Sequence, residues 1–327
     1  MRIIVTGAAG FIGMHLSLRL LADGHEVLGL DGFTPYYDVR LKHARFARLA
    51  SHPRFTGVEA MLEDAPGIAR LVRDAQADAV IHLAAQAGVR YSLEEPASYI
   101  NSNIVGTFNL LEAVRAAPIT HLLLASTSSV YGSNQPPFRE SDRADHPLSI
   151  YAATKKSTED IAHSYAHLFR QPTTILRFFT VYGTWYRPDM ALFKFTKAIL
   201  AGDPIDVYNG GRMARDFTYI DDVVEGLVRL LGKPPVSGAP DSAPAAPYRI
   251  VNVAGGAPLP LEDYIKAIET AAGRKAIRRD LPMQAGDMAA TAADSTLLER
   301  LTGFRPQTRL QDGVNEFVDW FKSYYGA

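Results

Sequence analysis

Two side chains near the middle of the sequence have the types and the spacing of a proton-transfer site. Tyr151 and Lys155 lie four residues apart in a segment with a helical pattern, so they share one face of that helix. A phenol with an ordinary pKa of about 10 is a poor base at neutral pH, and a neighbouring ammonium favours its ionised form. Thr127 follows the apolar run 121–125, where its hydroxyl could share a proton with the phenol. We therefore predict that these three residues move a proton together.

Tyr-x-x-x-Lys also fits an ordinary helix face, but a second pattern at the N-terminus favours the chemical interpretation. Residues 2–6 form a short β-branched run typical of a buried parallel strand. Glycines at positions 7, 10 and 13 follow it, and Ile12, Leu16 and Leu20 then mark the apolar face of a helix. A glycine loop between a strand and a helix lets backbone N–H groups approach a pyrophosphate. We therefore expect a dinucleotide site at this loop.

An acidic residue ends the next predicted strand, 26–30. Asp31 lies 18 residues after Gly13, close to the spacing of about 20 expected for a carboxylate that binds a ribose. A carboxylate there favours a free 2′-hydroxyl and repels a 2′-phosphate. NAD is therefore predicted rather than NADP, and the alternative for Asp31 is a turn or helix cap.

The elements that would position these residues alternate between strand and helix, which predicts an α/β fold with a doubly wound parallel sheet. Ligands bind at the carboxyl ends of the strands in such a sheet, where Gly7, Asp31, Ala84 and Thr127 all fall. His82 is expected to pack within the sheet. Further strands are predicted at 55–59, 78–83, 121–126, 173–177 and 249–253, and helices near 68–72, at 103–116 and from 151.

The second half of the chain changes character after residue 177. Residues 178–188 are aromatic and irregular, and we expect a pocket wall there rather than a sheet element. Residues 233–247 are rich in proline, alanine and serine and predict a surface loop. We expect an NAD-binding Rossmann domain at 1–180, to which 216–253 returns, and a smaller substrate-binding domain at 181–215 and 254–327. Amphipathic helices are predicted at 261–272 and 310–325.

Composition narrows the classes of function. The chain has 327 residues, a net charge of −1 and no cysteine, so nothing indicates nucleic acid as a partner, and disulfides and thiolate metal sites are excluded. No apolar run approaches the roughly 20 residues of a membrane span. The sequence contains neither a Walker-type G-K-[ST] motif nor H-E-x-x-H, and no metal centre is expected. The first strand begins at Arg2, so cytoplasmic localisation is the expectation.

With these residues described, the sequence resembles the extended short-chain dehydrogenases/reductases of the nucleotide-sugar epimerase family. The resemblance covers nearly the whole chain and rests on the glycine loop, Leu83-Ala84-Ala85-Gln86, Thr127 with Val130-Tyr131-Gly132, Tyr151 with Lys155, and Arg215-Asp216-Phe217. It implies tightly bound NAD, a nucleoside-diphosphate sugar as substrate, and a homodimer. The cofactor residues that it implies are Gly7, Gly10, Phe11, Ile12, Gly13, Asp31, Leu62, Leu83, Ala84, Ala85, Gln86, Asn103, Tyr151, Lys155 and Phe178.

Within the family, residues 86–90 and 180–183 with 187–191 look most like UDP-glucuronate 4-epimerases. The substrate residues that this resemblance implies are Arg90, Ser128, Ser129, Thr180, Arg187, Met190, Val207, Tyr208, Arg215 and Asp287. One departure is Met61, which stands where the family usually has an aspartate beside the adenine. The adenine contact from Leu62 would then depend on its backbone alone.

The residues after Thr127 separate the branches of the family. Dehydratases resemble this stretch with Asp and Glu where Ser128 and Ser129 stand, and UDP-glucuronate decarboxylases resemble it with Glu at Ser129. Epimerisation needs only Tyr151 and NAD. Ser128, Ser129 and Thr180 could hold a sugar carboxylate by neutral hydrogen bonds, with Arg187 as the countercharge; alternatively, these hydroxyls satisfy the loop backbone. Epimerisation of UDP-glucuronate is the predicted activity. Epimerisation of UDP-glucose or UDP-galactose is the second candidate, and decarboxylation of UDP-glucuronate is the third. A hydrolase or lyase on the same fold and a non-catalytic dinucleotide sensor are the competing classes, although a sensor has no need of the proton-transfer groups.

Overall fold

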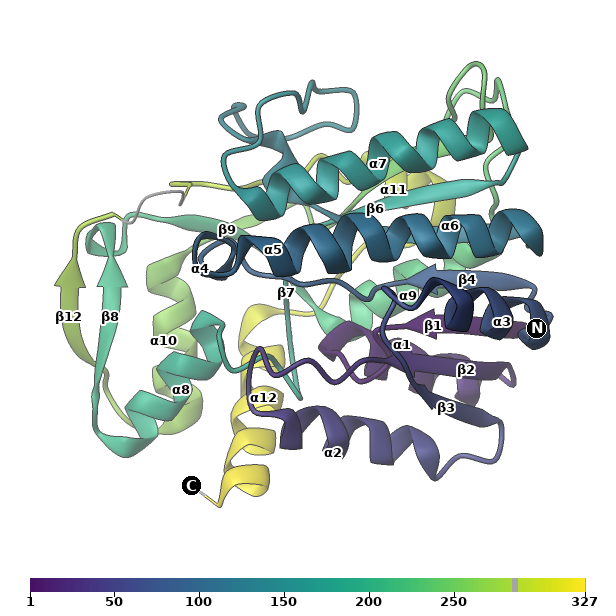
Figure 1. The fold of residues 1–327 in the computed structure, drawn as a ribbon. Coiled ribbons are helices and arrows are strands. Elements are labelled where there is room, and N and C mark those ends of the chain that lie inside the picture. Colours follow the sequence, from purple (N-terminus) through teal and green to yellow (C-terminus); the bar gives the residue numbers. More distant parts are fainter. Residues whose placement is uncertain (284–287, 327) are drawn as a thin grey trace.

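Seven parallel strands form the central sheet of the protein (Figure 1). The computed structural model describes residues 1–283 and 288–326. The strand order is β10-β6-β5-β4-β1-β2-β3, with β1 (Arg2–Thr6), β2 (Glu26–Asp31), β3 (Phe55–Glu59), β4 (Ala79–His82), β5 (His121–Thr127), β6 (Thr173–Phe178) and β10 (Tyr248–Val253). The chain runs outward from β1 to β3 and then returns to the other side of β1 with β4. The predicted doubly wound sheet is confirmed, and this reversal between β1 and β4 places a ligand crevice at their carboxyl ends.

Helices cover both faces of the sheet because neighbouring residues of each buried strand point to opposite sides. Ile3 and Val5 belong to one apolar cluster and Ile4 to another. The first cluster packs under α1 (Phe11–Ala22), α2 (Val39–Ala50), α9 (Ile220–Leu231) and α11 (Thr296–Thr302). The second packs under α3 (Ala65–Ala75), α6 (Gly106–Ala116) and α7 (Ile150–Phe169). His82 is fully buried between Thr6 and Thr107, in agreement with its predicted packing role.

The remaining elements lie beyond the carboxyl ends of the central strands (Figure 1). They form a three-stranded sheet of β7 (Thr180–Tyr182), β9 (Ala214–Tyr219) and β11 (Pro258–Pro260), and a parallel pair of β8 (Pro204–Tyr208) and β12 (Ile277–Leu281). The helices here are α4 (Tyr91–Glu94), α5 (Pro96–Tyr99), α8 (Ala191–Ala201), α10 (Leu261–Ala272) and α12 (Leu310–Tyr325). The bounds predicted for the last two are confirmed. The expectation that 178–188 holds no sheet element is wrong, because Val181 and Tyr182 are buried and β7 pairs with β9.

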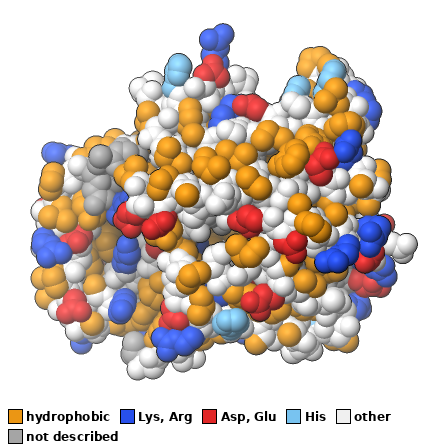
Figure 2. Space-filling model, viewed as in Figure 1, with side chains coloured by type: hydrophobic (Ala, Val, Ile, Leu, Met, Phe, Trp, Pro, Cys, Tyr) orange, Lys and Arg blue, Asp and Glu red, His pale blue; other side chains and the backbone are white. Residues whose placement is uncertain are grey.

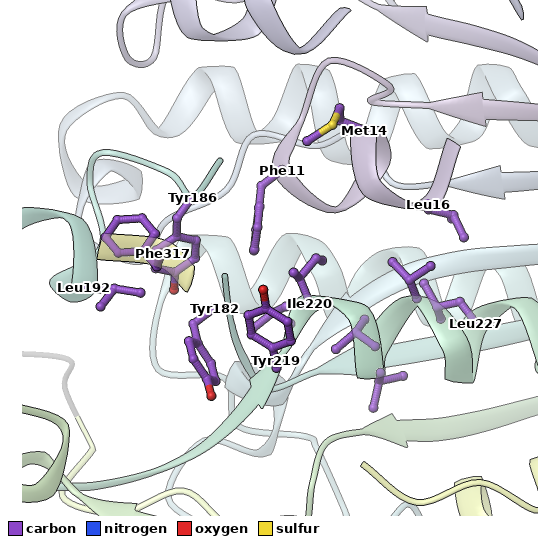
Figure 3. Packing of buried hydrophobic residues seen from close by; sticks show 14 of the residues in the cluster. Phe11, Met14, Leu16, Tyr182, Tyr186, Leu192, Tyr219, Ile220, Leu227 and Phe317 are labelled. Carbon is purple, nitrogen blue, oxygen red and sulfur yellow. The ribbon is translucent and has the colours of Figure 1, made fainter. Parts of the chain in front are cut away.

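One apolar core joins the central sheet to these later elements, as Figure 3 shows. Phe11, at the start of α1, meets Tyr186 with ring centroids 4.9 Å apart, and Tyr186 meets Phe317 of α12 at 6.3 Å. The helix that follows the glycine loop is therefore held by the segment after β7. None of the helices in the described part of the chain is long and apolar enough to cross a membrane.

Candidate active site

A cavity of about 420 Å³ opens at the carboxyl ends of the central strands. Most of the residues predicted for the cofactor line it: Gly7, Gly10, Phe11, Ile12, Gly13, Asp31, Leu62, Leu83, Ala84, Ala85, Gln86, Tyr151, Lys155 and Phe178. Its wall also contains Thr127 and five of the residues predicted for the substrate, Ser128, Ser129, Thr180, Arg187 and Met190. The fold thus brings together side chains from the glycine loop and from the segments that follow β2, β4, β5 and β6.

At Gly7 and Gly13 of the glycine loop, a side chain would collide with nearby backbone atoms. Gly7 has a φ of +73°, and a Cβ there would lie 2.8 Å from the backbone nitrogen of Ala84. A Cβ on Gly13 would lie 2.0 Å from the carbonyl oxygen of Gly7. These positions require glycine both for conformation and for close packing of the loop against β4 and α1. The cradle therefore has the form that a dinucleotide pyrophosphate needs.

Asp31 ends β2 and is 8% exposed. Its Oδ2 accepts a hydrogen bond from the backbone nitrogen of Ala9 at 3.0 Å, and its Oδ1 accepts one from Phe33 at 2.9 Å. The carboxylate therefore supports the glycine loop, as the turn alternative anticipated. A carboxylate has about four acceptor sites, so capacity for a ribose hydroxyl remains.

Tyr151 lies in the first turn of α7. Ser149 caps this helix, since its hydroxyl accepts a hydrogen bond from the backbone nitrogen of Ala152 at 3.1 Å. A helix N-terminus favours negative charge, which helps a phenol that must lose its proton. Thr127 ends β5 and accepts a hydrogen bond from the backbone nitrogen of Ser129 at 3.2 Å, so its hydroxyl is held in place beside the cavity.

The opposing effects on the Tyr151 pKa come from burial, from Arg187 and from Thr127. Burial raises the pKa of the Tyr151 phenol, whereas the positive charge of Arg187 and a hydrogen bond with Thr127 lower it. The sequence assigned this effect of charge to Lys155, and the structure assigns it to Arg187. Lys155 Nζ makes no hydrogen bond to the phenol or to any other described residue.

Lys155 is a buried cation, and its Nζ has no hydrogen-bond partner among the described residues. Its side chain is 1% exposed, and burial lowers its pKa to about 8, against an opposing effect of Glu159. Leaving such a group unsatisfied is costly, so it is a natural donor to a bound ligand. Together with the glycine cradle, this unpartnered ammonium fits a nicotinamide dinucleotide whose ribose would receive the hydrogen bond.

A buried ion pair aligns the three elements that carry the reactive side chains. Glu159 of α7 is fully buried and accepts two hydrogen bonds from Arg177 of β6, at 2.9 and 2.7 Å. It also accepts a hydrogen bond from Ser126 of β5 at 2.6 Å. The pair therefore ties α7 to the strands that end in Thr127 and Phe178.

Asn103, predicted to bind the cofactor, does not line the cavity and supports it from behind. It lies in η1, a π-helix at Ile100–Val105 that precedes α6. Its Oδ1 accepts from the backbone nitrogen of Gln86 at 2.8 Å, and its Nδ2 donates to the Gln86 carbonyl at 3.0 Å and to Thr154 at 3.0 Å. Asn103 thus holds the segment after β4 against α7. Single π-turns inside helices are frequent at functional sites.

Four other predicted substrate residues do not line the cavity: Arg90, Val207, Tyr208 and Arg215. The guanidinium of Arg90 lies 5.2 Å from the ring centroid of Tyr208, so these two are brought together. Val207 is fully buried in the core, and Arg215 donates to the carbonyl oxygens of Ala214 and Ala289. Asp287 lies outside the described residues.

Two residues near Arg187, namely Asp189 and Tyr36, were not among the site residues predicted from the sequence. Asp189 binds Arg187 through both of its oxygens, with distances of 3.1 Å to Nε and 2.6 Å to Nη2. The Tyr36 phenol donates a hydrogen bond to Asp189 at 3.0 Å. Burial alone would lower the Arg187 pKa, but Asp189 reverses this and raises it above the ordinary value. The Arg187–Asp189 pair joins residues two apart in the sequence. No local pattern signals the contact between Asp189 and Tyr36, because it joins segments 153 residues apart.

Comparisons with known proteins agree with this geometry. The model of the NAD dependent epimerase/dehydratase family matches residues 3–253. A Rhizobium meliloti protein named "Probable UDP-glucuronate 4-epimerase" is 54% identical, over 99% of this chain and 98% of its own. The crystal structure of UDP-glucuronic acid 4-epimerase from Bacillus cereus, in complex with UDP-glucuronic acid and NAD, has a TM-score of 0.90 at 34% identity and covers 99% of this chain and 100% of its own.

A tyrosine-to-phenylalanine mutant of the Bacillus cereus enzyme, solved with NAD and a 4-deoxy-4-fluoro analogue of the sugar nucleotide, has a TM-score of 0.91 at 34% identity and covers 99% of this chain and 100% of its own. That substitution fits a role for tyrosine as the base. The match to the family model extends over most of the chain, from β1 to β10. The chain therefore belongs to the NAD dependent epimerase/dehydratase family.

Proposed function

We propose that the protein inverts C4 of UDP-glucuronate to give UDP-galacturonate, with NAD as a resident cofactor. The observation that carries this proposal is that Ser128, Ser129, Thr180 and Arg187 line the same cavity as Tyr151. These are the side chains assigned from the sequence to the C6 carboxylate. The similarity to named UDP-glucuronate 4-epimerases supports the same substrate.

The residues that would hold NAD are distributed along the cavity. The glycine loop would receive the pyrophosphate, Asp31 the adenosine ribose, and Lys155 the nicotinamide ribose. When bound, NAD accepts a hydride from C4 of the sugar and returns it, so that it is regenerated in each turnover.

The proton of the 4-hydroxyl passes to Tyr151 Oη, with Thr127 as the hydroxyl that shares it. Because burial raises the pKa of this phenol, Arg187 and Thr127 must offset that effect for the phenol to act as a base. The resulting 4-keto sugar turns over in the cavity, and the hydride then returns to its other face. Tyr151 gives back the proton at the same oxygen.

The 4-keto form of glucuronate is a β-keto acid and could lose carbon dioxide. The hydroxyls at 128, 129 and 180 offer the carboxylate neutral hydrogen bonds, and the sequence places no acid or base next to Thr127 that would assist elimination or decarboxylation. This argues for epimerisation over the decarboxylase alternative. UDP-glucose or UDP-galactose remains the second candidate substrate, because it needs only Tyr151 and NAD.

The test combines the bound nucleotide with the product. Mass spectrometry of the purified protein should find NAD that was not added, and NMR of a reaction with UDP-glucuronate should show UDP-galacturonate. Equal turnover of UDP-glucose and UDP-glucuronate would reject the carboxylate site and promote the second candidate.

We also propose a cytoplasmic homodimer. Figure 2 shows hydrophobic side chains gathered over the region of α6 and α7. Val105, Phe108, Leu168 and Phe169 in and beside these helices are 40–67% exposed. An exposed apolar face of this kind is typical of a subunit interface. Sedimentation of the protein should give twice the chain mass, and cell fractionation would test the compartment.

A further inference from the structure

The cation assigned to the sugar carboxylate is already paired within the protein. Asp189 takes two hydrogen bonds from Arg187, through Nε and Nη2, and the two side chains are 22% and 23% exposed. Arg187 lines the cavity, whereas Asp189 does not. No described residue accepts a hydrogen bond from Arg187 Nη1, so this nitrogen remains available to a ligand. A substrate therefore meets a guanidinium that is fixed in orientation and partly neutralised by Asp189.

Tyr36, which also lines the cavity, contacts both members of this pair. Its phenol donates to Asp189 Oδ2 at 3.0 Å, and its ring centroid lies 5.7 Å from the Arg187 guanidinium. A Cβ on Gly88 would lie 2.5 Å from the phenol oxygen, so the absence of a side chain at Gly88 makes room for Tyr36. The pair is thus built into the junction between the segment after β2 and the segment after β7.

The proposed reaction places conflicting demands on the carboxylate contact. The protein must bind the sugar carboxylate, yet the contacts to that carboxylate must break so that the 4-keto sugar can rotate before the hydride returns. An unpaired guanidinium would make charge-assisted hydrogen bonds of about twice the ordinary strength with that carboxylate. Such bonds would stabilise the bound sugar equally before and after oxidation, which lowers KM without raising kcat.

We propose that Asp189 is a positioning residue that moderates Arg187, so that the acidic sugar is recognised but remains free to turn. This inference rests on the proposed function and extends it to a residue outside the cavity. In its absence, Arg187 would grip the C6 carboxylate too firmly. A merely structural Asp189 would instead affect acidic and neutral sugars alike.

The test is Asp189→Asn in the NAD-loaded enzyme, which removes the charge and keeps the size of the side chain. We expect KM for UDP-glucuronate to fall by about threefold or more, the scale of a partly exposed ion pair, and kcat to fall with it. For UDP-glucose, KM should stay near its wild-type value, and kcat should change less than for UDP-glucuronate, since both sugars share only the effect of Arg187 on the Tyr151 pKa. A rise in KM for UDP-glucuronate, or equal losses with both sugars, would overturn the proposal.

Binding provides a second readout that does not depend on turnover. In a Tyr151→Phe background, adding Asp189→Asn should tighten UDP-glucuronate in calorimetry and leave UDP-glucose unchanged; unchanged affinity for both would count against the proposal. Asp189→Glu should restore wild-type kinetics, and a failure to do so would also count against it. Asp312→Asn is the matched control, because it breaks an exposed pair with Arg309 away from the cavity.

These experiments separate the two proposals. If the wild-type enzyme does not convert UDP-glucuronate, the proposed function is wrong. If it does so, and Asp189→Asn changes neither the KM nor the affinity selectively, only the role of Asp189 is wrong.

Discussion

The two ends of the cavity are built by different means. At the glycine loop the backbone forms the surface, and Gly7, Gly13 and Ala84 approach one another so closely that a Cβ on either glycine would clash with backbone. At the Tyr151 end the surface consists of side chains, namely hydroxyls, a phenol and the Arg187–Asp189 pair. A rigid backbone cradle suits a cofactor that stays bound throughout. A lining of adjustable side chains suits a sugar that must be held, oxidised and turned.

The electrostatics of the two ends differ in the same way. Asp31 is engaged by two backbone N–H groups, so its position does not depend on the ligand. Lys155 has no partner among the described residues, and the Tyr151 pKa reflects a balance between burial and the charge of Arg187. Variants at the Tyr151 end should therefore alter rate and selectivity, whereas variants at the glycine loop should alter cofactor retention or folding.

The largest effect on rate is expected at the phenol itself. Tyr151→Phe keeps the ring and removes the proton acceptor, so turnover should fall by about 10²–10⁴-fold or more. The protein should still carry NAD, which absorbance and mass spectrometry of the purified variant would verify. Activity within a few-fold of wild type would reject Tyr151 as the base.

At the other end, Gly13→Ala should act through the backbone. The new Cβ would lie 2.0 Å from the Gly7 carbonyl oxygen, so the loop must move, and overpacking of this kind costs about 1–3 kcal/mol. We expect a lower melting temperature and little retained NAD. Gly232→Ala is the control, since nothing lies within 4 Å of its Cβ. Full NAD content in Gly13→Ala would contradict the role of the glycine loop in binding NAD.

The sequence predicted the cofactor end better than the sugar end, for a physical reason. The requirement for glycine at position 7 and for small residues at Ala84 and Ala85 comes from local backbone geometry, which leaves a pattern along the chain. Arg187 and Asp189 are close in the sequence, but the contact that joins this pair to Tyr36 depends on how distant loops meet. No periodicity or spacing records such a contact.

Asn103 illustrates an intermediate case. Its presence near the site was inferred from a family resemblance, but its role depends on a π-helix that places the amide against the backbone of Gln86. Intrinsic propensity predicts a helix there without specifying its hydrogen-bond period. Likewise, β7 was missed because a short buried strand and an irregular aromatic segment have the same composition.

A smaller and more selective effect is expected at the carboxylate contact. Thr180→Ala removes one hydroxyl that would bind the sugar carboxylate, and a hydrogen bond to a charged group is worth about 1.5–3 kcal/mol. Activity with UDP-glucuronate should fall roughly tenfold or more, with little change for UDP-glucose. A trace of UDP-pentose should form as the loosened 4-keto acid loses carbon dioxide, which mass spectrometry of the products would detect. Thr270→Ala, an exposed position on α10, should change neither activity; equal losses with both sugars in Thr180→Ala would contradict the contact.

The smallest effect on turnover is expected at Asp31, because it lies at the cofactor end and does not touch the reacting atoms. Asp31→Ala should lower the amount of NAD that remains through purification, since the variant loses both a ribose acceptor and the bonds to Ala9 and Phe33. Asp31→Asn removes the charge but keeps an acceptor oxygen for one of the two loop N–H groups, so it should disturb the loop less than Asp31→Ala does. If the charge selects against a 2′-phosphate, Asp31→Asn should retain some NADP when both nucleotides are supplied, and turnover in excess NAD should stay within a few-fold of wild type. Chromatography of the nucleotide released on denaturation measures both. Near-stoichiometric NADP in the wild-type protein would show that Asp31 does not choose the cofactor, and the carboxylate would then be left with the support of the glycine loop as its role.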